Sequence, residues 1–163
     1  MDIIINKRFL KYKGYKFRCS IGKSGFSSSK KEGDLTTPMG VFKLGTLYFR
    51  KDRIKSVKFK LKKKIIKKNM GWCDDAQSKK YNQEINFPFR YSAEKLYRKD
   101  RFYDIFINVK YNQSPVKKGK GSGIFLHLTN KKYKPTKGCI AVLKKDLLKI
   151  LPLIDKKTKI SII

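Results

Sequence analysis

The sequence has one histidine, one tryptophan and three cysteines in 163 residues, and these shortages limit its chemistry. Three cysteines cannot all pair with one another, so a full disulfide framework is excluded. The cysteines show no C-x-x-C spacing, and a single histidine is too few for the common structural zinc sites. We therefore expect no bound metal.

Long apolar runs are also missing. None approaches the roughly 18 residues that a membrane-spanning helix needs, so we predict no transmembrane segment. The apolar part of Met1 to Lys7 is far too short for a signal peptide, and no small-residue cleavage site follows it. There are no internal repeats and no linker, so residues 1–163 are predicted to form a single domain with a real core.

Acidic residues are scarce, with 12 against 42 basic ones, which gives a formal charge of +30. Such a charge favours polyanions as partners, namely nucleic acid, acidic lipid or an anionic cell-wall polymer. Only seven of the basic residues are arginine, the residue favoured for planar phosphate recognition, and the lysines occur in every segment. Nucleic-acid binding is therefore disfavoured, and a bias in residue usage explains the charge equally well.

Alternation of apolar and polar residues predicts strands along most of the chain. The expected strands are 3–5, 9–12, 15–21, 38–44, 46–49, 57–61, 103–109 and 158–163, with Gly45 as a kink or bulge. In 15–21 the alternation buries Cys19, which is predicted to be an inert core thiol. Helical spacing is clear only in 144–153, and 93–99 is expected to form a helical turn or two. The fold class is therefore mainly β, a sandwich or barrel with one or two short helices.

The stretch from Ile124 to Val142 carries the most chemistry. His127 lies in the first of its two apolar runs, and Cys139 follows Gly138 and opens the second. An imidazole beside a thiol can take its proton and hold the thiolate as an ion pair. Two strand ends joined by the loop 128–138 would bring these side chains together. The alternative is a buried structural thiol and a histidine without a chemical role.

A second region of interest, residues 71–89, is expected to be long and irregular, as binding loops often are. Its tryptophan would line a substrate groove and its acidic pair would receive a substrate ammonium; alternatively, the tryptophan packs and the acids pair with lysines. The candidate substrate-binding residues are Trp72, Asp74, Asp75, Tyr81 and Asn82. Cys73 is a weaker candidate nucleophile, because no glycine precedes it and no strand pattern follows it.

Two sequence blocks carry a resemblance to a known family. The pattern T-x-G-C-I-x-V, with a histidine upstream at a strand end, resembles the signature of the L,D-transpeptidases, whose catalytic domain is called YkuD-type. The matching residues are His127, Thr136, Gly138 and Cys139. An earlier block resembles the T-P-x-G-x-F segment of the same domain through Thr37, Pro38, Gly40 and Phe42. The blocks occur in the order found in the family, and the resemblance extends over most of the chain.

The resemblance implies an activity. L,D-transpeptidases take peptidoglycan stem peptides, acylate their cysteine at the bond between the L-centre of diaminopimelate and D-Ala, and pass the acyl group to an amine of another stem. Water as the acceptor would instead give an L,D-carboxypeptidase. The family needs no cofactor and is acylated by penem-type inhibitors. It implies the periplasm or cell envelope, whereas the absence of a signal peptide in this chain leaves the cytoplasm open.

The expected mechanism assigns a role to each motif residue. His127 takes the proton of Cys139, and the backbone N–H groups of Cys139 and Gly138 stabilise the oxyanion. Gly138 lets the backbone approach the substrate without a Cβ, and Thr136 orients the loop. Because no acid lies near the motif, a backbone carbonyl just after His127 is expected to hold the imidazole tautomer, that of Leu128 or Thr129.

Two points depart from a simple family assignment. Many members carry arginine two positions after the cysteine, where this chain has Ala141. A different class of function is also open, namely an inactive lysine-rich β domain that binds anionic polymer. Such binding would weaken steeply with salt and would survive Cys139→Ala.

Overall fold

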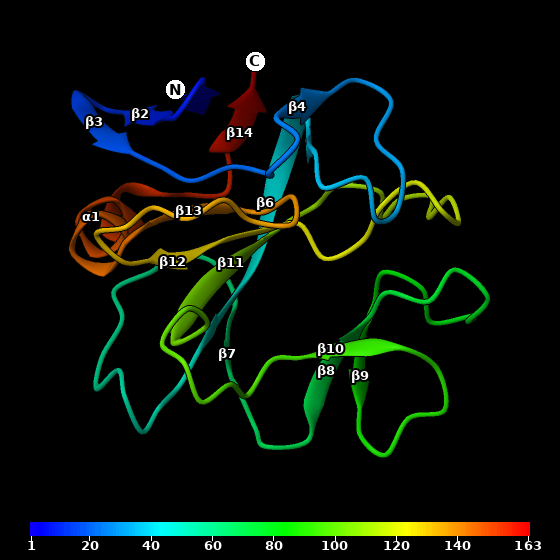
Figure 1. Ribbon diagram of the computed structural model, residues 1–163. Coiled ribbons are helices and arrows are strands. Elements are labelled where there is room, and N and C mark those ends of the chain that lie inside the picture. Colours follow the sequence, from blue (N-terminus) through cyan, green and yellow to red (C-terminus); the bar gives the residue numbers. More distant parts are fainter.

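The computed structural model describes residues 1–163, and its main feature is a nine-stranded sheet. The strand order is β13-β12-β11-β6-β14-β1-β2-β3, with β7 paired to β6 (Figure 1). These strands are β1 Ile3–Asn6, β2 Phe9–Tyr12, β3 Tyr15–Arg18, β6 Gly40–Phe49, β7 Lys63–Ile65, β11 Ile105–Val109, β12 Phe125–Thr129, β13 Ile140–Leu143 and β14 Lys159–Ile162. A short parallel pair, β4 Phe26–Ser27 and β5 Thr37–Pro38, lies beside them.

Strand β6 joins the two halves of this sheet. Its first residues pair with β14 and its last residues pair with β11. The register with β11 shifts between Ile107, opposite Leu47, and Val109, opposite Leu44. This irregularity includes Gly45, so the predicted kink is confirmed, although the two strands expected around it form one continuous strand.

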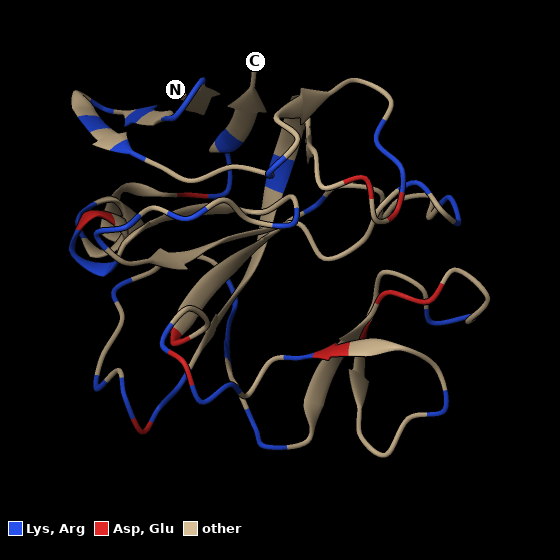
Figure 2. Ribbon diagram, viewed as in Figure 1, with Lys and Arg blue, Asp and Glu red and all other residues tan.

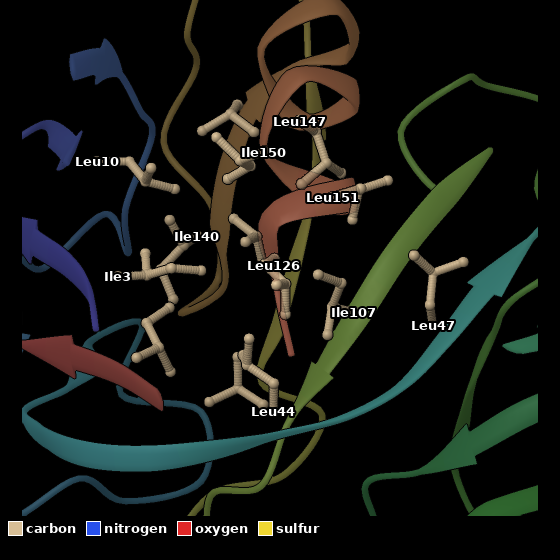
Figure 3. Packing of buried hydrophobic residues seen from close by; sticks show 14 of the residues in the cluster. Ile3, Leu10, Leu44, Leu47, Ile107, Leu126, Ile140, Leu147, Ile150 and Leu151 are labelled. Atoms are coloured by element: carbon tan, nitrogen blue, oxygen red, sulfur yellow. The ribbon is translucent and has the colours of Figure 1, made fainter. Parts of the chain in front are cut away.

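The two halves enclose one large aliphatic core of 24 buried residues, as the sandwich prediction requires. Figure 3 shows Ile3 and Leu10 facing Leu126 and Ile140 across this core. Helix α1 Lys144–Ile150 covers one end with Leu147 and Ile150, and a 3-10 turn, η1 Leu151–Leu153, continues it. The mainly β sandwich and the helix expected at 144–153 are therefore confirmed.

A separate three-stranded sheet, in the order β10-β8-β9, corrects two sequence predictions. Its strands are β8 Met70–Cys73, β9 Glu84–Asn86 and β10 Ala93–Lys95. The segment 71–89 is thus partly regular. The helical turns expected at 93–99 are wrong, because Ala93 to Lys95 pair with Cys73 to Gly71 and this pairing outweighs the local helix propensity. Figure 1 shows this sheet set apart from the main one.

The strand predicted at 57–61 is also wrong. Val57 and Phe59 are buried in the main core, so the alternation was read correctly. The segment has no partner strand, however, and ladder pairing begins only at Lys63, opposite Leu47. Alternating burial without a neighbouring strand gives an extended but irregular segment.

The positive charge is not confined to one element. Figure 2 shows lysine and arginine on strands, loops and the helix alike, as a residue-usage bias predicts. No helix of the structure is long and apolar enough to cross a membrane.

Candidate active site

Strands β12 and β13 separate two kinds of side chain by their period of two. Leu126 and Ile140 point into the large aliphatic core. The opposite face carries Phe125 and Cys139, which belong to a second, mainly aromatic cluster of nine buried residues. His127 has the same parity as Phe125 and therefore shares this face. The thiol and the imidazole thus lie on one side of the same strand pair.

The register places the two side chains at diagonal positions on this face. The strands are parallel, with His127 opposite Ala141 and Leu126 opposite Ile140. Cys139 directly precedes β13, so it lies beside Phe125, whose N–H donates to Sγ over 3.3 Å. The thiol itself donates to the carbonyl oxygen of Gly123 over 3.1 Å. The thiol is therefore held by the backbone, without a hydrogen bond to the imidazole.

A short turn fixes the backbone before the thiol. Gly138 has φ of +142°, a conformation that favours glycine, and a Cβ there would lie 2.7 Å from the carbonyl oxygen of Thr36. Thr136 Oγ1 donates to the carbonyl oxygen of Cys139 over 2.6 Å and accepts the N–H of Gly138 over 3.1 Å. These two hydrogen bonds tie the Thr136 side chain to the backbone on both sides of the Gly138–Cys139 peptide bond. The glycine requirement comes from the protein's own backbone as well as from any substrate.

The two blocks that carry the family resemblance meet at this turn. Thr37 Oγ1 donates to the carbonyl oxygen of Gly138 over 2.8 Å and accepts the N–H of Gly22 over 2.8 Å. Lys23 N–H also donates to the carbonyl oxygen of Thr136. Segments about 100 residues apart in the sequence therefore build one local structure.

A cavity of about 520 Å³ opens over this turn. Its walls include His127, Cys139, Thr136 and Gly138 from the motif. Of the predicted substrate-binding residues, Trp72 and Asp74 line it and the other three do not. The cavity thus joins the motif to one edge of the small sheet.

Both reactive groups are neutral at rest. Burial raises the pKa of the Cys139 thiol to about 12, and the nearby Glu94 carboxylate acts in the same direction. Burial lowers the pKa of His127 to about 4, although the carbonyl of Leu128 favours the charged ring. A thiolate–imidazolium ion pair is therefore disfavoured before a substrate binds. A neutral imidazole, however, is the form that can accept a proton.

The imidazole is oriented as predicted. His127 Nδ1 lies 2.9 Å from the carbonyl oxygen of Leu128, so Nδ1 carries the proton and Nε2 is left as the acceptor. The ring of Tyr103 packs edge-on against the imidazole, with centroids 5.2 Å apart. A backbone carbonyl thus takes the place of an acidic third residue.

A comparison with family models decides the assignment. The model of the L,D-transpeptidase catalytic domain, YkuD, matches residues 3–162. The chain belongs to this family. No curated protein and no solved structure matched the chain. The family acts on peptidoglycan peptides and is usually associated with the cell envelope.

In this L,D-transpeptidase domain, three predicted substrate residues have structural partners instead. Asn82 is buried, accepts from Trp72 Nε1 over 3.0 Å and from the N–H of Gly123 over 2.9 Å, and donates to the carbonyl oxygen of Asn112 over 2.7 Å. The Tyr81 hydroxyl donates to Glu32. Asp75 accepts the N–H groups of Gln77 and Ser92. None of the three lines the cavity.

The other two cysteines are buried away from the cavity. Cys19 is 1% exposed in the main core, and burial raises its pKa to about 12, as expected for an inert thiol. Cys73 is fully buried in β8 and does not line the cavity. No group of three or more histidine, cysteine or acidic side chains is arranged to hold a metal ion.

Sequence reasoning missed several residues of the cavity wall. Glu94 accepts the Tyr103 hydroxyl over 2.7 Å and pairs with Arg98 at 3.4 Å. Lys30 enters from a loop remote in sequence. Glu94 was not identified as a cavity residue, because its segment was predicted to be helical and not to pair with the strand that carries Trp72. Lys30 resembled many other loop lysines.

Proposed function

We propose that this domain catalyses cysteine-dependent acyl transfer on peptidoglycan stem peptides, with Cys139 as the nucleophile and His127 as the base. One observation carries the proposal: the two side chains share one face of β12–β13 and line one cavity. The turn before the thiol is held by both family motifs, which ties the family's chemistry to this cavity.

The proposed reaction begins from the neutral pair. As Sγ attacks the carbonyl carbon on the L-centre of diaminopimelate, its proton passes to His127 Nε2. The tetrahedral oxyanion collapses, the C–N bond to D-Ala breaks, and the imidazolium returns the proton to the leaving amine. An amine of a second stem then attacks the thioester and releases the thiol. Water in its place would give the L,D-carboxypeptidase reaction.

Asp74 is proposed to bind the ammonium of the stem. One carboxylate oxygen, Oδ1, is fully buried and has no hydrogen-bond partner. Asp74 lines the cavity together with Glu94, whose pKa is raised by burial, with the charge of Asp74 as a smaller contribution. Two carboxylates that lie close together repel each other, so a positively charged group placed between Asp74 and Glu94 would be stabilised by both. The side-chain ammonium of diaminopimelate is such a group.

The test is intact-protein mass after incubation with a carbapenem, for wild type, Cys139→Ala and Cys73→Ala. We expect a single adduct that only Cys139→Ala abolishes. The same three proteins are then given a tetrapeptide stem and the products are identified by mass. A cross-linked dimer indicates transfer and a tripeptide indicates hydrolysis. Absence of an adduct on every form, or its loss only in Cys73→Ala, would contradict the proposal.

The contribution of Asp74 is tested separately with Asp74→Asn. We expect a higher KM for a stem with a free ammonium and little change for one in which that amine is acetylated. Asp75→Asn is the matched control, because Asp75 holds a loop and lies outside the cavity. Equal effects of Asp74→Asn on both stems would contradict the assignment.

A further inference from the structure

Lys30 differs from every other lysine of the chain. There are 35 lysines, and Lys30 is the only one that is buried, at 5% exposure. A lysine ammonium is almost never buried unless it is paired or used. Its Nζ donates to Asp34 Oδ1 over 2.7 Å, which satisfies one of its three N–H bonds. No other protein acceptor bonds to Nζ, and the side chain lines the same cavity as Cys139.

Two glycines make room for this side chain. A Cβ on Gly121, φ +98°, would lie 2.8 Å from Cε of Lys30. A Cβ on Gly138 would lie 3.3 Å from its Nζ. The ammonium therefore lies against the turn that directly precedes the thiol.

Asp34 holds the ammonium in place. Its carboxylate also accepts the N–H groups of Lys31 over 2.7 Å and of Thr36 over 2.9 Å. Although burial opposes the charged form, these bonds and Lys30 keep the pKa of Asp34 below its usual range. The carboxylate is therefore charged, and the ammonium is preorganised before any substrate binds.

A second hydrogen-bond donor for the oxyanion is needed, because one of the two expected backbone donors already bonds within the protein. The N–H of Gly138 donates to Thr136 Oγ1 over 3.1 Å. The N–H of Cys139 has no partner in the protein and remains available. Ala141 stands where many family members have arginine. A single backbone N–H would otherwise face the developing negative charge alone.

We propose that Lys30 Nζ is the second oxyanion donor of the active site, acting together with the backbone N–H of Cys139. This inference rests on the proposed acyl transfer. When the Sγ–C bond forms, the electron pair of the C=O bond moves to oxygen. Lys30 donates a hydrogen bond to that oxyanion and keeps its proton. When the C–N bond breaks, the pair returns and the C=O bond reforms.

The electrostatics of the cavity agree with this role. Lys30 also acts to lower the pKa of Cys139, against the larger effect of burial. A fixed ammonium in a water-poor site stabilises developing charge far more than it would in bulk water. Of the other basic residues in the wall, Lys134 and Lys137 are exposed, and Arg98 is paired with Glu94 and Asp100.

The experiment compares two reactions of Cys139 that differ in one respect. Acylation by a carbapenem passes through an oxyanion, whereas alkylation by iodoacetamide does not. In Lys30→Met we expect the acylation rate to fall about 100-fold and the alkylation rate to fall much less. Lys30→Arg should recover part of the acylation rate. Lys31→Met removes an exposed charge from the same loop and should leave the ratio of the rates unchanged.

A second variant serves as the control for misfolding, because removing the Lys30 ammonium leaves the Asp34 carboxylate without its ion-pair partner. The double variant Lys30→Met/Asp34→Asn removes both charges and should show the same loss of acylation relative to alkylation. An equal fall in both rates, or no fall in acylation, would overturn the role of Lys30 while leaving Cys139 as the nucleophile. Failure of the wild type to be acylated would overturn the proposed function, and this inference with it.

Discussion

The two faces of the β12–β13 strand pair differ in their side chains and in their roles, although they belong to the same strands. One face places Leu126 and Ile140 in a mainly aliphatic core. The other places His127 and Cys139 over a cavity, among aromatic rings and a few charged groups. A period of two thus lets one strand pair contribute to stability and to chemistry independently. Substitutions on the two faces should therefore have separable effects.

The largest effect is expected for Cys139→Ala. Loss of the nucleophile should reduce acyl transfer by about 10⁴-fold or more, since no other cavity thiol can replace it. Thermal unfolding of the same variant should change little, because the thiol is a minor part of the aromatic cluster. Stem-peptide turnover measured by mass checks the first part and calorimetry the second. Retained turnover would show that the chemistry lies elsewhere.

A substitution on the opposite face should show the reverse pattern. Leu126 is fully buried, so Leu126→Ala should lower the free energy of unfolding by about 2–5 kcal/mol. At a temperature where the variant is still folded, its carbapenem acylation rate should stay close to that of the wild type. Urea unfolding and the acylation assay test this together. A large loss of activity in the folded variant would break the distinction between the faces.

A smaller effect on stability is expected at Asn82, which joins Trp72 to the loop before β12. Asn82→Ala leaves Trp72 Nε1 and the N–H of Gly123 without their acceptor, and should cost about 1–3 kcal/mol. KM for the stem peptide should change less than in Asp74→Asn. Urea unfolding and steady-state kinetics separate the two. A selective rise in KM for Asn82→Ala would restore it as a substrate contact.

The last effect concerns pH. The pKa of His127 falls from 6.5 in the unfolded chain to about 4 in the folded one. The unfolded state therefore binds more protons between these values, so this residue makes stability fall as the pH drops from about 6.5 to 4. His127→Gln should flatten that part of the stability curve. Equal pH dependence in both proteins, measured by urea unfolding, would contradict the buried neutral imidazole.

The low pKa of His127 also determines how the acylation rate depends on pH in the acidic range. With a pKa of about 4, the free enzyme keeps a proton-accepting imidazole well below pH 6.5. Carbapenem acylation should therefore decline only near pH 4. A decline centred near 6.5 would instead indicate a solvated histidine.

The features that the sequence predicted correctly depend on patterns of neighbouring residues. The alternation around Cys19 predicted its burial, and helical spacing predicted α1. In each case the information lies within a few residues, because strand and helix periods are local.

What it missed depends on distant partners. Ala93 to Lys95 have the composition of a helix, but β8 is free to pair with them. The Lys30 ammonium lies against the turn at Gly138, more than 100 residues away in the sequence. No window of sequence around any of these residues contains the group that determines its environment.

The place of β14 has a consequence for how the molecule assembles. This strand lies between β1 and β6, although it follows every other strand in the sequence. Strands β1 to β3 therefore have no route to join β6 until β14 has formed its ladder. Contacts of such long sequence separation make folding slow, on the order of milliseconds to seconds. Closure of the nine-stranded sheet therefore depends on residues 159–162, which connect β1 to β6.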